Sequence, residues 1–180
     1  MLLAPSIRNF AKRRSMNIPH TDKKRIVIIG GGFGGISLAK KLKKLNTQVV
    51  LIDRHNYHTF QPLLYQVSTS GLEPDSIAYP IRKVLKSLNN FHFRLASVKK
   101  IDTKRREIHS DIGALTYDYL VLATGTKTNF FGNADIEKNA MPMKPAPQAL
   151  NIRSLMLQTF ERADDCEDEE DRKALLSVCI

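Results

Sequence analysis

The chain has 180 residues, of which 42% are hydrophobic and 26% are charged, and its formal net charge is +10. This composition is typical of a globular protein and excludes the disordered and fibrous classes. No apolar run approaches the roughly 20 residues that a membrane-spanning helix needs.

The excess positive charge lies entirely in the first sixty residues, which hold twelve Lys or Arg and two Asp or Glu. Part of it forms one face of an expected helix: Lys40, Lys41, Lys43 and Lys44. We interpret this face as a solvated surface, with attraction to anionic lipid as the alternative. Nucleic-acid binding is not expected, because neither zinc-ligand spacing nor a basic patch interleaved with aromatic residues accompanies the charge.

The first fifteen residues are basic and contain no acid, and an internal Met16 follows them. This composition is typical of a mitochondrial targeting peptide. The alternative, which we favour, is an upstream extension ahead of a start at Met16.

A β-α-β unit is expected next. Arg25–Ile29 is short and rich in β-branched residues, which predicts a buried strand. Phe33–Leu45 has apolar residues at helical spacing opposite its lysines, which predicts a helix packed on that strand. Gln48–Asp53 predicts a second strand, parallel to the first because the crossover between such strands is right-handed.

The following segment is expected to be less regular. His55–Gly71 is aromatic and apolar, and loops of this length usually serve a site. Ser76–Leu88 predicts a helix with Pro80 in its first turn, and Phe91–Val98 predicts a strand.

Short, turn-punctuated segments then predict an antiparallel β-meander over 99–103, 106–110 and 114–117. Tyr119–Ala123 is an apolar strand that leads into Thr124 and Gly125.

The last part of the chain begins with Gly132–Pro147, whose three prolines indicate a linker. Gln148–Ala163 predicts a helix, an acidic run covers Asp164–Asp171, and Leu175–Ile180 predicts an apolar strand. The two cysteines lie in this part and have no metal-ligand or C-x-x-C spacing.

A glycine-rich turn joins the first expected strand to the first helix. Gly30 allows a tight turn, Gly32 lets a phosphate approach the backbone, and Gly35 lets helix and strand pack closely. The helix N-terminus at Phe33 presents N–H groups and a positive dipole end to phosphates. Asp53, at the end of the second strand, can accept hydrogen bonds from ribose hydroxyls. This order of elements predicts a dinucleotide-binding site.

Three segments together resemble the type II NADH:quinone oxidoreductases, which are single-subunit NADH dehydrogenases that do not pump protons. They are Arg25–Asp53 (RIVIIGGGFGGISLAKKL…VVLID), His55–Arg82 (HNYHTFQPLLYQVSTSGLEPDSIAYPIR) and Tyr117–Gly132 (YDYLVLATGTKTNFFG). The middle segment is the specific one, because the glycine loop and Ala-Thr-Gly occur across the wider disulfide-reductase-like flavoproteins. The resemblance implies an α/β fold: a Rossmann-like FAD-binding domain with a parallel sheet and an antiparallel β-meander insertion.

The resemblance also implies roles for residues. The glycine loop would hold the FAD pyrophosphate, Asp53 and Arg54 the adenosine ribose, and the Val98 backbone the adenine, while Ala123–Gly125 would pass close to the cofactor. The implied FAD contacts are Gly30, Gly31, Gly32, Phe33, Gly34, Gly35, Asp53, Arg54, Val98, Ala123, Thr124 and Gly125. No catalytic residue and no metal ligand is implied.

On this resemblance the chain divides into a basic extension (1–23), an FAD-binding domain (24–131), a linker (132–147) and the start of an NADH-binding domain (148–180). The family's second G-x-G-x-x-G, which binds NADH, follows a strand like Ser177–Ile180 and does not occur in these residues. We therefore expect a fragment truncated before the second Rossmann domain and inactive by itself.

For the complete enzyme, the resemblance implies hydride transfer from NADH to FAD and electron delivery to a membrane quinone. It implies a cytoplasmic location, peripheral on the inner face of a bacterial plasma membrane through parts not in this chain, with the mitochondrion as the alternative. A homodimer is one possible assembly. Two other functions stay open: a non-catalytic remnant that at most binds FAD, and a sulfide:quinone or disulfide reductase. The second would need reactive cysteines, and none lies between residues 30 and 165.

Overall fold

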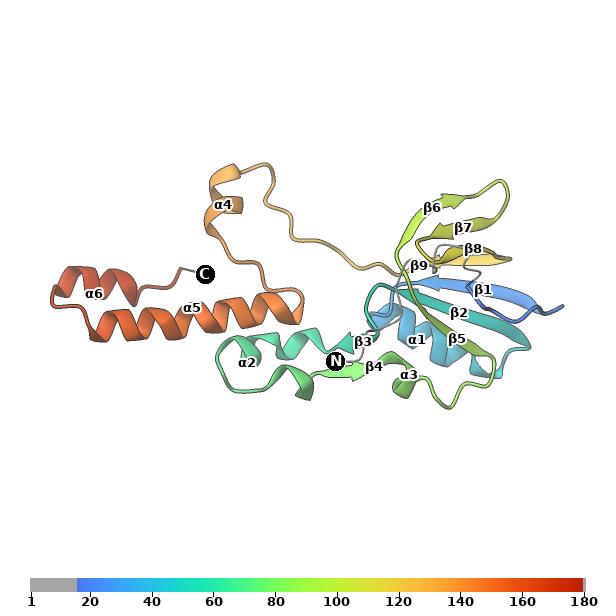
Figure 1. Cartoon of the computed structure of the whole chain (residues 1–180), viewed down its shortest axis with the longest axis horizontal. Coiled ribbons are helices and arrows are strands. Elements are labelled where there is room, and N and C mark those ends of the chain that lie inside the picture. The colour runs from blue at the N-terminus through green and yellow to red at the C-terminus, as the bar shows by residue number, and fades with distance from the viewer. Residues whose placement is uncertain (1–15, 180) are drawn as a thin grey trace, which may run out of the picture. The chain divides into compact units, whose positions relative to one another are not determined.

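The structure is a computed structural model that describes residues 16–179. The two interpretations of residues 1–15 lie outside the described residues. The chain forms two compact units (Figure 1). Among the described residues, the first unit comprises 16–58 and 79–125, and the second comprises 59–78 and 126–179.

A four-stranded parallel sheet forms the centre of the first unit, in the order β5-β2-β1-β9. The strands are β1 (Lys24–Ile29), β2 (Thr47–Asp53), β5 (Phe91–Leu95) and β9 (Tyr119–Leu122). β1 is flanked on both sides, so that Ile26 lies opposite Val49 of β2 and Tyr119 of β9. The predicted β-α-β unit is confirmed, and so is the strand predicted over 119–123, which is β9.

Both faces of this sheet are covered, which explains the long apolar runs of its two central strands, β1 and β2. On one face lie helix α1 (Phe33–Lys41), its 3₁₀ extension η2 (Leu42–Lys44) and helix α3 (Ile81–Val84). The buried residues of this layer are Ile26, Ile28, Val49, Leu51 and Phe93 from the sheet and Ile36, Ala39, Ile81, Leu85 and Leu88 from the covering segments.

The opposite face of the sheet is covered by the meander (Figure 1). Its strands are β6 (Val98–Asp102), β7 (Glu107–Ser110) and β8 (Gly113–Thr116), paired antiparallel as predicted. Ile108 and Leu115 are buried against Val27 and Val50 of the sheet. The predicted strand over 91–98 was too long, because the chain leaves the parallel sheet after Leu95 and enters the meander at Val98.

Two predictions between β2 and β5 were wrong. The predicted loop over 55–71 contains β3 (Tyr57–Thr59), η3 (Gln61–Leu63) and α2 (Leu64–Ser68). The predicted helix over 76–88 is divided into η4 (Pro74–Ser76), β4 (Ala78–Pro80) and α3. The reason is Pro80, which disfavours the helical conformation in the residue before it and serves as the N-cap of the short helix α3.

The second unit is built on helix α5 (Ala146–Asp164), which confirms the predicted helix over 148–163. Its buried side chains pack against those of α2 and against Ile77, which follows η4: the core consists of Leu64, Val67, Ile77, Ala146 and Ala149. Arg153 of α5 also forms an ion pair with Glu73 at 3.3 Å.

The expected linker over 132–147 is only partly irregular. It contains helix α4 (Ala134–Asn139), whose N-cap residue Asn133 accepts hydrogen bonds from the N–H groups of Asp135 and Ile136. Pro145 and Pro147 mark the start of α5, because proline needs no hydrogen-bond acceptor in the first turn of a helix.

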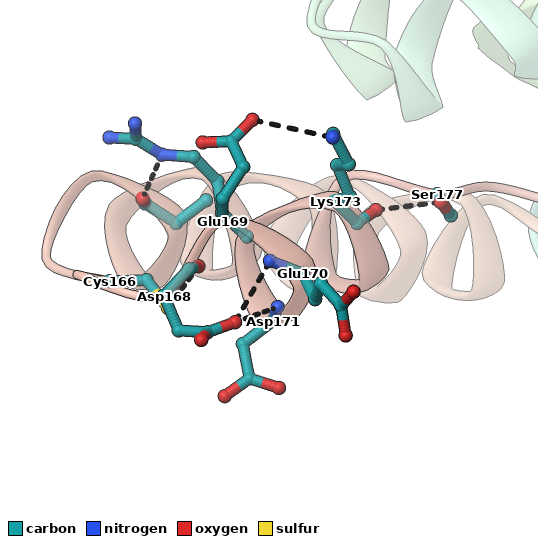
Figure 2. A network of polar contacts seen from close by, with 9 residues as sticks. Cys166, Asp168, Glu169, Glu170, Asp171, Lys173 and Ser177 are labelled. Carbon is teal, nitrogen blue, oxygen red and sulfur yellow. Dashed lines mark hydrogen bonds and ion pairs between the residues drawn. The ribbon is translucent and has the colours of Figure 1, made fainter.

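The acidic run starts a further helix, α6 (Glu169–Leu175). Figure 2 shows the Asp168 carboxylate turned toward the backbone of Glu170 and Asp171, whose N–H groups donate to it at 2.8 and 2.9 Å. Glu169 and Lys173 form an ion pair one turn apart at 3.7 Å. The Asp168 carboxylate thus satisfies two N–H groups in the first turn of α6, and the acidic residues there interact favourably with the positive end of the helix dipole.

The predicted strand over 175–180 was wrong for the residues described. Leu175 ends α6, and residues 176–179 adopt no strand. A strand needs a neighbouring strand for its hydrogen bonds, and no described strand pairs with this segment. No helix among residues 16–179 is both long enough and apolar enough to cross a membrane.

Candidate dinucleotide site

The residues predicted to bind a dinucleotide lie at the carboxyl edge of the parallel sheet. Gly30 follows β1, Asp53 ends β2, and Ala123 follows β9. The chain moves from β1 outward to β2 and β5 and then returns to the other side of β1 with β9, so the strand order reverses beside β1. In open α/β sheets, ligands bind at the carboxyl edge at such a reversal.

Gly30 lies where three backbone segments meet. Its N–H donates to the Ile52 carbonyl at 2.8 Å, and the N–H of Ala123 donates to the Ile29 carbonyl at 2.7 Å. The φ angle of Gly30 is +112°, and a Cβ atom there would lie 2.1 Å from the Ala123 carbonyl oxygen. Only glycine fits this turn.

Gly35 has an equally close neighbour. A Cβ atom at Gly35 would lie 1.9 Å from the Gly30 carbonyl oxygen and 3.3 Å from the Ile28 side chain. The start of α1 therefore packs directly on the end of β1 at the glycine turn.

Gly32 is different, because a Cβ atom there would meet nothing within 4 Å. Gly32 is the N-cap of α1, no side chain caps this helix end, and its first turn contains no acidic residue. The N–H of Ile36 donates to the Gly32 carbonyl, so the N–H groups of Gly34 and Gly35 have no acceptor within the helix. This end of α1 is thus an open, positively polarised surface suited to phosphate oxygens.

Asp53 connects the end of β2 to the glycine loop. Its Oδ2 accepts the Gly31 N–H at 2.5 Å, and its Oδ1 accepts the His55 N–H at 2.7 Å. The side chain is 18% exposed. These two backbone hydrogen bonds hold Asp53 in place. Because a carboxylate offers about four acceptor positions, Asp53 can still accept hydrogen bonds from ligand hydroxyls.

The predicted contacts Arg54 and Val98 come from two different segments near the end of β2. Arg54 follows β2 and is exposed. The N–H of Ala96 donates to the Asp53 carbonyl at 2.9 Å, which brings the β5–β6 connection to the end of β2. Val98 starts β6 two residues later, half-buried, at an irregularity in the pairing of β6 with β7.

The residues after β9 lie on the other side of the glycine loop. Ala123 is half-buried and is the nearest neighbour that a Cβ atom at Gly34 would meet, at 4.0 Å. Thr124 and Gly125 are exposed, and Gly125 has a φ angle of +71°. The loop is therefore bordered by β2 on one side and by Ala123 on the other.

Two contacts of the loop were missed from the sequence. The His58 ring lies with Nδ1 3.1 Å from the Gly31 carbonyl oxygen and packs edge-on against the Phe33 ring, with centroids 4.8 Å apart. Ile81 of α3 lies so close to Gly31 that a Cβ atom there would be 2.5 Å from its Cδ1. Neither contact has a periodic signal, because both come from the segment predicted as a loop and a single helix.

No group of His, Cys, Asp and Glu side chains within residues 16–179 is arranged to hold a metal ion. The described residues bring together the glycine loop, residues 30–35, and one carboxylate, that of Asp53.

Comparison with known proteins gives a family match and named relatives. The family described as pyridine nucleotide-disulphide oxidoreductase matches residues 24–174. A type II NADH:quinone oxidoreductase of Mycobacterium tuberculosis is 39% identical over 160 residues, which cover 87% of this chain and 35% of that protein.

Two solved structures are also similar to this chain. The NDH2 of Plasmodium falciparum in complex with NADH matches with a TM-score of 0.73 and 28% identity, over 84% of this chain and 32% of that one. The sulfide:quinone oxidoreductase of Aquifex aeolicus matches with a TM-score of 0.70 and 29% identity, over 77% of this chain and 32% of that one. The chain thus spans about a third of the length of the proteins that it matches.

Proposed function

Because this chain belongs to the pyridine nucleotide-disulphide oxidoreductase family, we propose that its glycine loop and Asp53 bind FAD. The observation that carries the proposal is the open N-terminus of α1 at Gly32, flanked by a carboxylate that the backbone holds in place.

The residues present fit the pyrophosphate and ribose of FAD. Gly30 and Gly35 are required by the protein's own packing, but Gly32 is not, so its missing side chain leaves space for a phosphate. The N–H groups at the start of α1 would hold the pyrophosphate, and Asp53 would accept hydrogen bonds from the ribose of the adenosine. Arg54, Val98 and the turn 123–125 would complete the contacts.

We further propose that these residues serve an NADH:quinone oxidoreductase, as the Mycobacterium tuberculosis relative is named. The flavin would supply the redox chemistry, since it can accept a hydride and pass on its two electrons. This chain's part is to bind the cofactor and fix its adenosine end. The NADH-binding domain from residue 148, peripheral attachment to the inner face of a bacterial or mitochondrial membrane, and a homodimer are further predictions of this proposal.

Gly32 provides the direct test of FAD binding. Gly32→Ala should weaken FAD binding at least about tenfold, because the new methyl group occupies the phosphate position and displaces charge-assisted hydrogen bonds. Stability should change little, since φ at Gly32 is −76° and nothing lies within 4 Å. Flavin fluorescence quenching measures the affinity, and urea unfolding measures the stability.

Ser37→Thr is the matched control, because it adds a methyl group at an exposed position of the same helix. It should bind FAD like the natural chain. Equal FAD affinity of Gly32→Ala and Ser37→Thr, or no FAD binding by the natural chain, would contradict the proposal.

The 180 residues alone should not reduce a quinone when FAD and NADH are supplied. They contain one G-x-G-x-x-G, and hydride transfer requires a second nucleotide held beside the flavin. NADH consumption with a soluble quinone measures this. Turnover above that of free FAD would show that the chain binds NADH productively.

The likeness to a sulfide:quinone oxidoreductase supports a second candidate function, in which the FAD held by the glycine loop and Asp53 serves sulfide oxidation. Such chemistry needs a reactive thiol beside the flavin, and the segment that carries the proposed FAD contacts, residues 30–125, contains no cysteine. We therefore favour the NADH:quinone assignment.

A further inference from the structure

A second polar site lies at the amino edge of the parallel sheet, opposite the glycine loop. A groove of about 380 Å³ is formed there by the stretch leading into β1, the β6–β7 turn and the β8–β9 connection. Four basic side chains and one carboxylate line it: Lys23, Arg25, Arg105, Arg106 and Asp118. β1 separates the two sites by its six residues, or about 20 Å at the usual rise of a strand.

Arg25 is a fixed part of this groove. Its Nε donates to Gln48 Oε1 at 2.6 Å, and its Nη1 donates to the Thr116 carbonyl at 3.2 Å. The guanidinium is thus held by the protein, and its charge contributes to the field of the groove without being free to move.

Asp118 is committed to other partners. It accepts the Arg25 N–H at 2.8 Å and the Lys24 Nζ at 2.9 Å. These two hydrogen bonds hold the pKa of Asp118 below its usual range, so the carboxylate stays ionised and pairs with Lys24. It does not pair with the remaining cations of the groove.

Lys23, Arg105 and Arg106 are exposed, and within the part of the chain that the structure describes none of them forms an ion pair within 4 Å. They come from two segments far apart in sequence and line the same groove. Three cations therefore line one groove without a direct ion pair among the described residues, although Asp118 and Asp102 attract Arg106 and Arg105 from further away.

Hydrogen bonds fix the backbone of the β6–β7 turn at both arginines. Asp102 Oδ1 accepts the Arg105 N–H at 2.9 Å, and the Arg106 carbonyl accepts the Tyr117 N–H at 2.8 Å. Arg106 has a φ angle of +50°, a conformation that favours Gly or Asn. Residues kept in such conformations collect at functional sites.

We propose that this groove binds a phosphate-bearing anion through Lys23, Arg105 and Arg106. Cations presented from two segments suit a ligand with two linked phosphates, because guanidinium groups donate paired hydrogen bonds to phosphate oxygens. The phosphates could belong to a soluble molecule or to an anionic lipid headgroup.

Titration with inorganic pyrophosphate, followed by the backbone amide resonances of the chain, tests the proposal. The amides of residues 21–23 and 105–106 should shift together, separately from those of the glycine loop. Arg106→Gly should weaken this response at least about tenfold, since it removes charge-assisted hydrogen bonds. Its fold should persist, because glycine suits the positive φ.

Lys100→Ala is the control, because it removes an equal charge from an exposed position of the same meander outside the groove. It should change the affinity less than about twofold, as expected for a solvent-screened charge outside the groove. Arg105→Ala, at the neighbouring position of the turn, should weaken binding as Arg106→Gly does.

Sedimentation with phosphatidylglycerol vesicles, and with phosphatidylcholine vesicles for comparison, distinguishes the two phosphate sources. Binding of free pyrophosphate indicates a soluble ligand. Arg106-dependent binding to phosphatidylglycerol vesicles alone indicates a lipid headgroup. Binding of neither probe, or equal binding by Arg106→Gly and Lys100→Ala, would overturn the proposal.

Discussion

Gly30→Ala is expected to destabilise the first unit by about 2–5 kcal/mol, which combines left-handed backbone strain with overpacking. The new Cβ atom would lie 2.1 Å from the carbonyl oxygen of Ala123, and φ at this residue is +112°. Relief would require separating β1 from β9 at the end where they pair. Since domains are stable by only about 5–15 kcal/mol, much of the unit should be unfolded at moderate temperature.

Urea unfolding followed by far-ultraviolet circular dichroism measures this effect. Gly34→Ala is the matched control, because a Cβ atom there meets only the Ala123 Cβ at 4.0 Å. That substitution should leave stability equal or raise it by up to about 1 kcal/mol, the helix preference of alanine over glycine. Similar unfolding midpoints for the two variants would show that the close approach at Gly30 is absent in solution.

Asp53→Ala is expected to weaken FAD binding by about 10- to 150-fold, the range for hydrogen bonds to a charged group. The variant loses the acceptor for ribose hydroxyls and also leaves the Gly31 N–H without its 2.5 Å partner. The loop at the start of α1 should then be less well ordered before FAD arrives.

Asp53→Asn separates these two roles. Its amide oxygen can still accept the Gly31 N–H, while the charge and one set of acceptors are lost, so its FAD affinity should fall between those of Asp53→Ala and the natural chain. Asp22→Asn removes a charge at an exposed position of the same unit and should have no effect. Equal affinities for Asp53→Ala and Asp22→Asn would exclude Asp53 from the cofactor site.

The sequence was sufficient to predict the parallel sheet because its signals are local. The apolar run Arg25–Ile29, the glycines and the acid at position 53 each follow from short-range patterns, and the structure places them together at one edge. The apolar pattern over 119–123 likewise predicted a strand, and the structure shows that this strand pairs with β1.

Prediction failed where neighbours in space decide the conformation. Apolar periodicity over 76–88 suits a helix, but Pro80 divides that segment, and only the fold shows that Ile81 then contacts Gly31. The apolar residues 175–179 suit a strand, yet no described strand is available to pair with them. The position of His58 beside the Gly31 carbonyl likewise depends on a turn that no spacing indicates.

The place of β1 at the centre of the sheet has a consequence for synthesis on the ribosome. One of its partners, β2, follows within one helix, but the other, β9, is made only after the whole meander. Until Tyr119–Leu122 emerges, one edge of β1 has no partner for its backbone groups. The chain between β1 and β9 is long, so its closure when the two strands pair is slow. We expect the emerging chain to stay protease-sensitive and dependent on chaperones until then, with the sheet and the Gly30 turn forming in one late step.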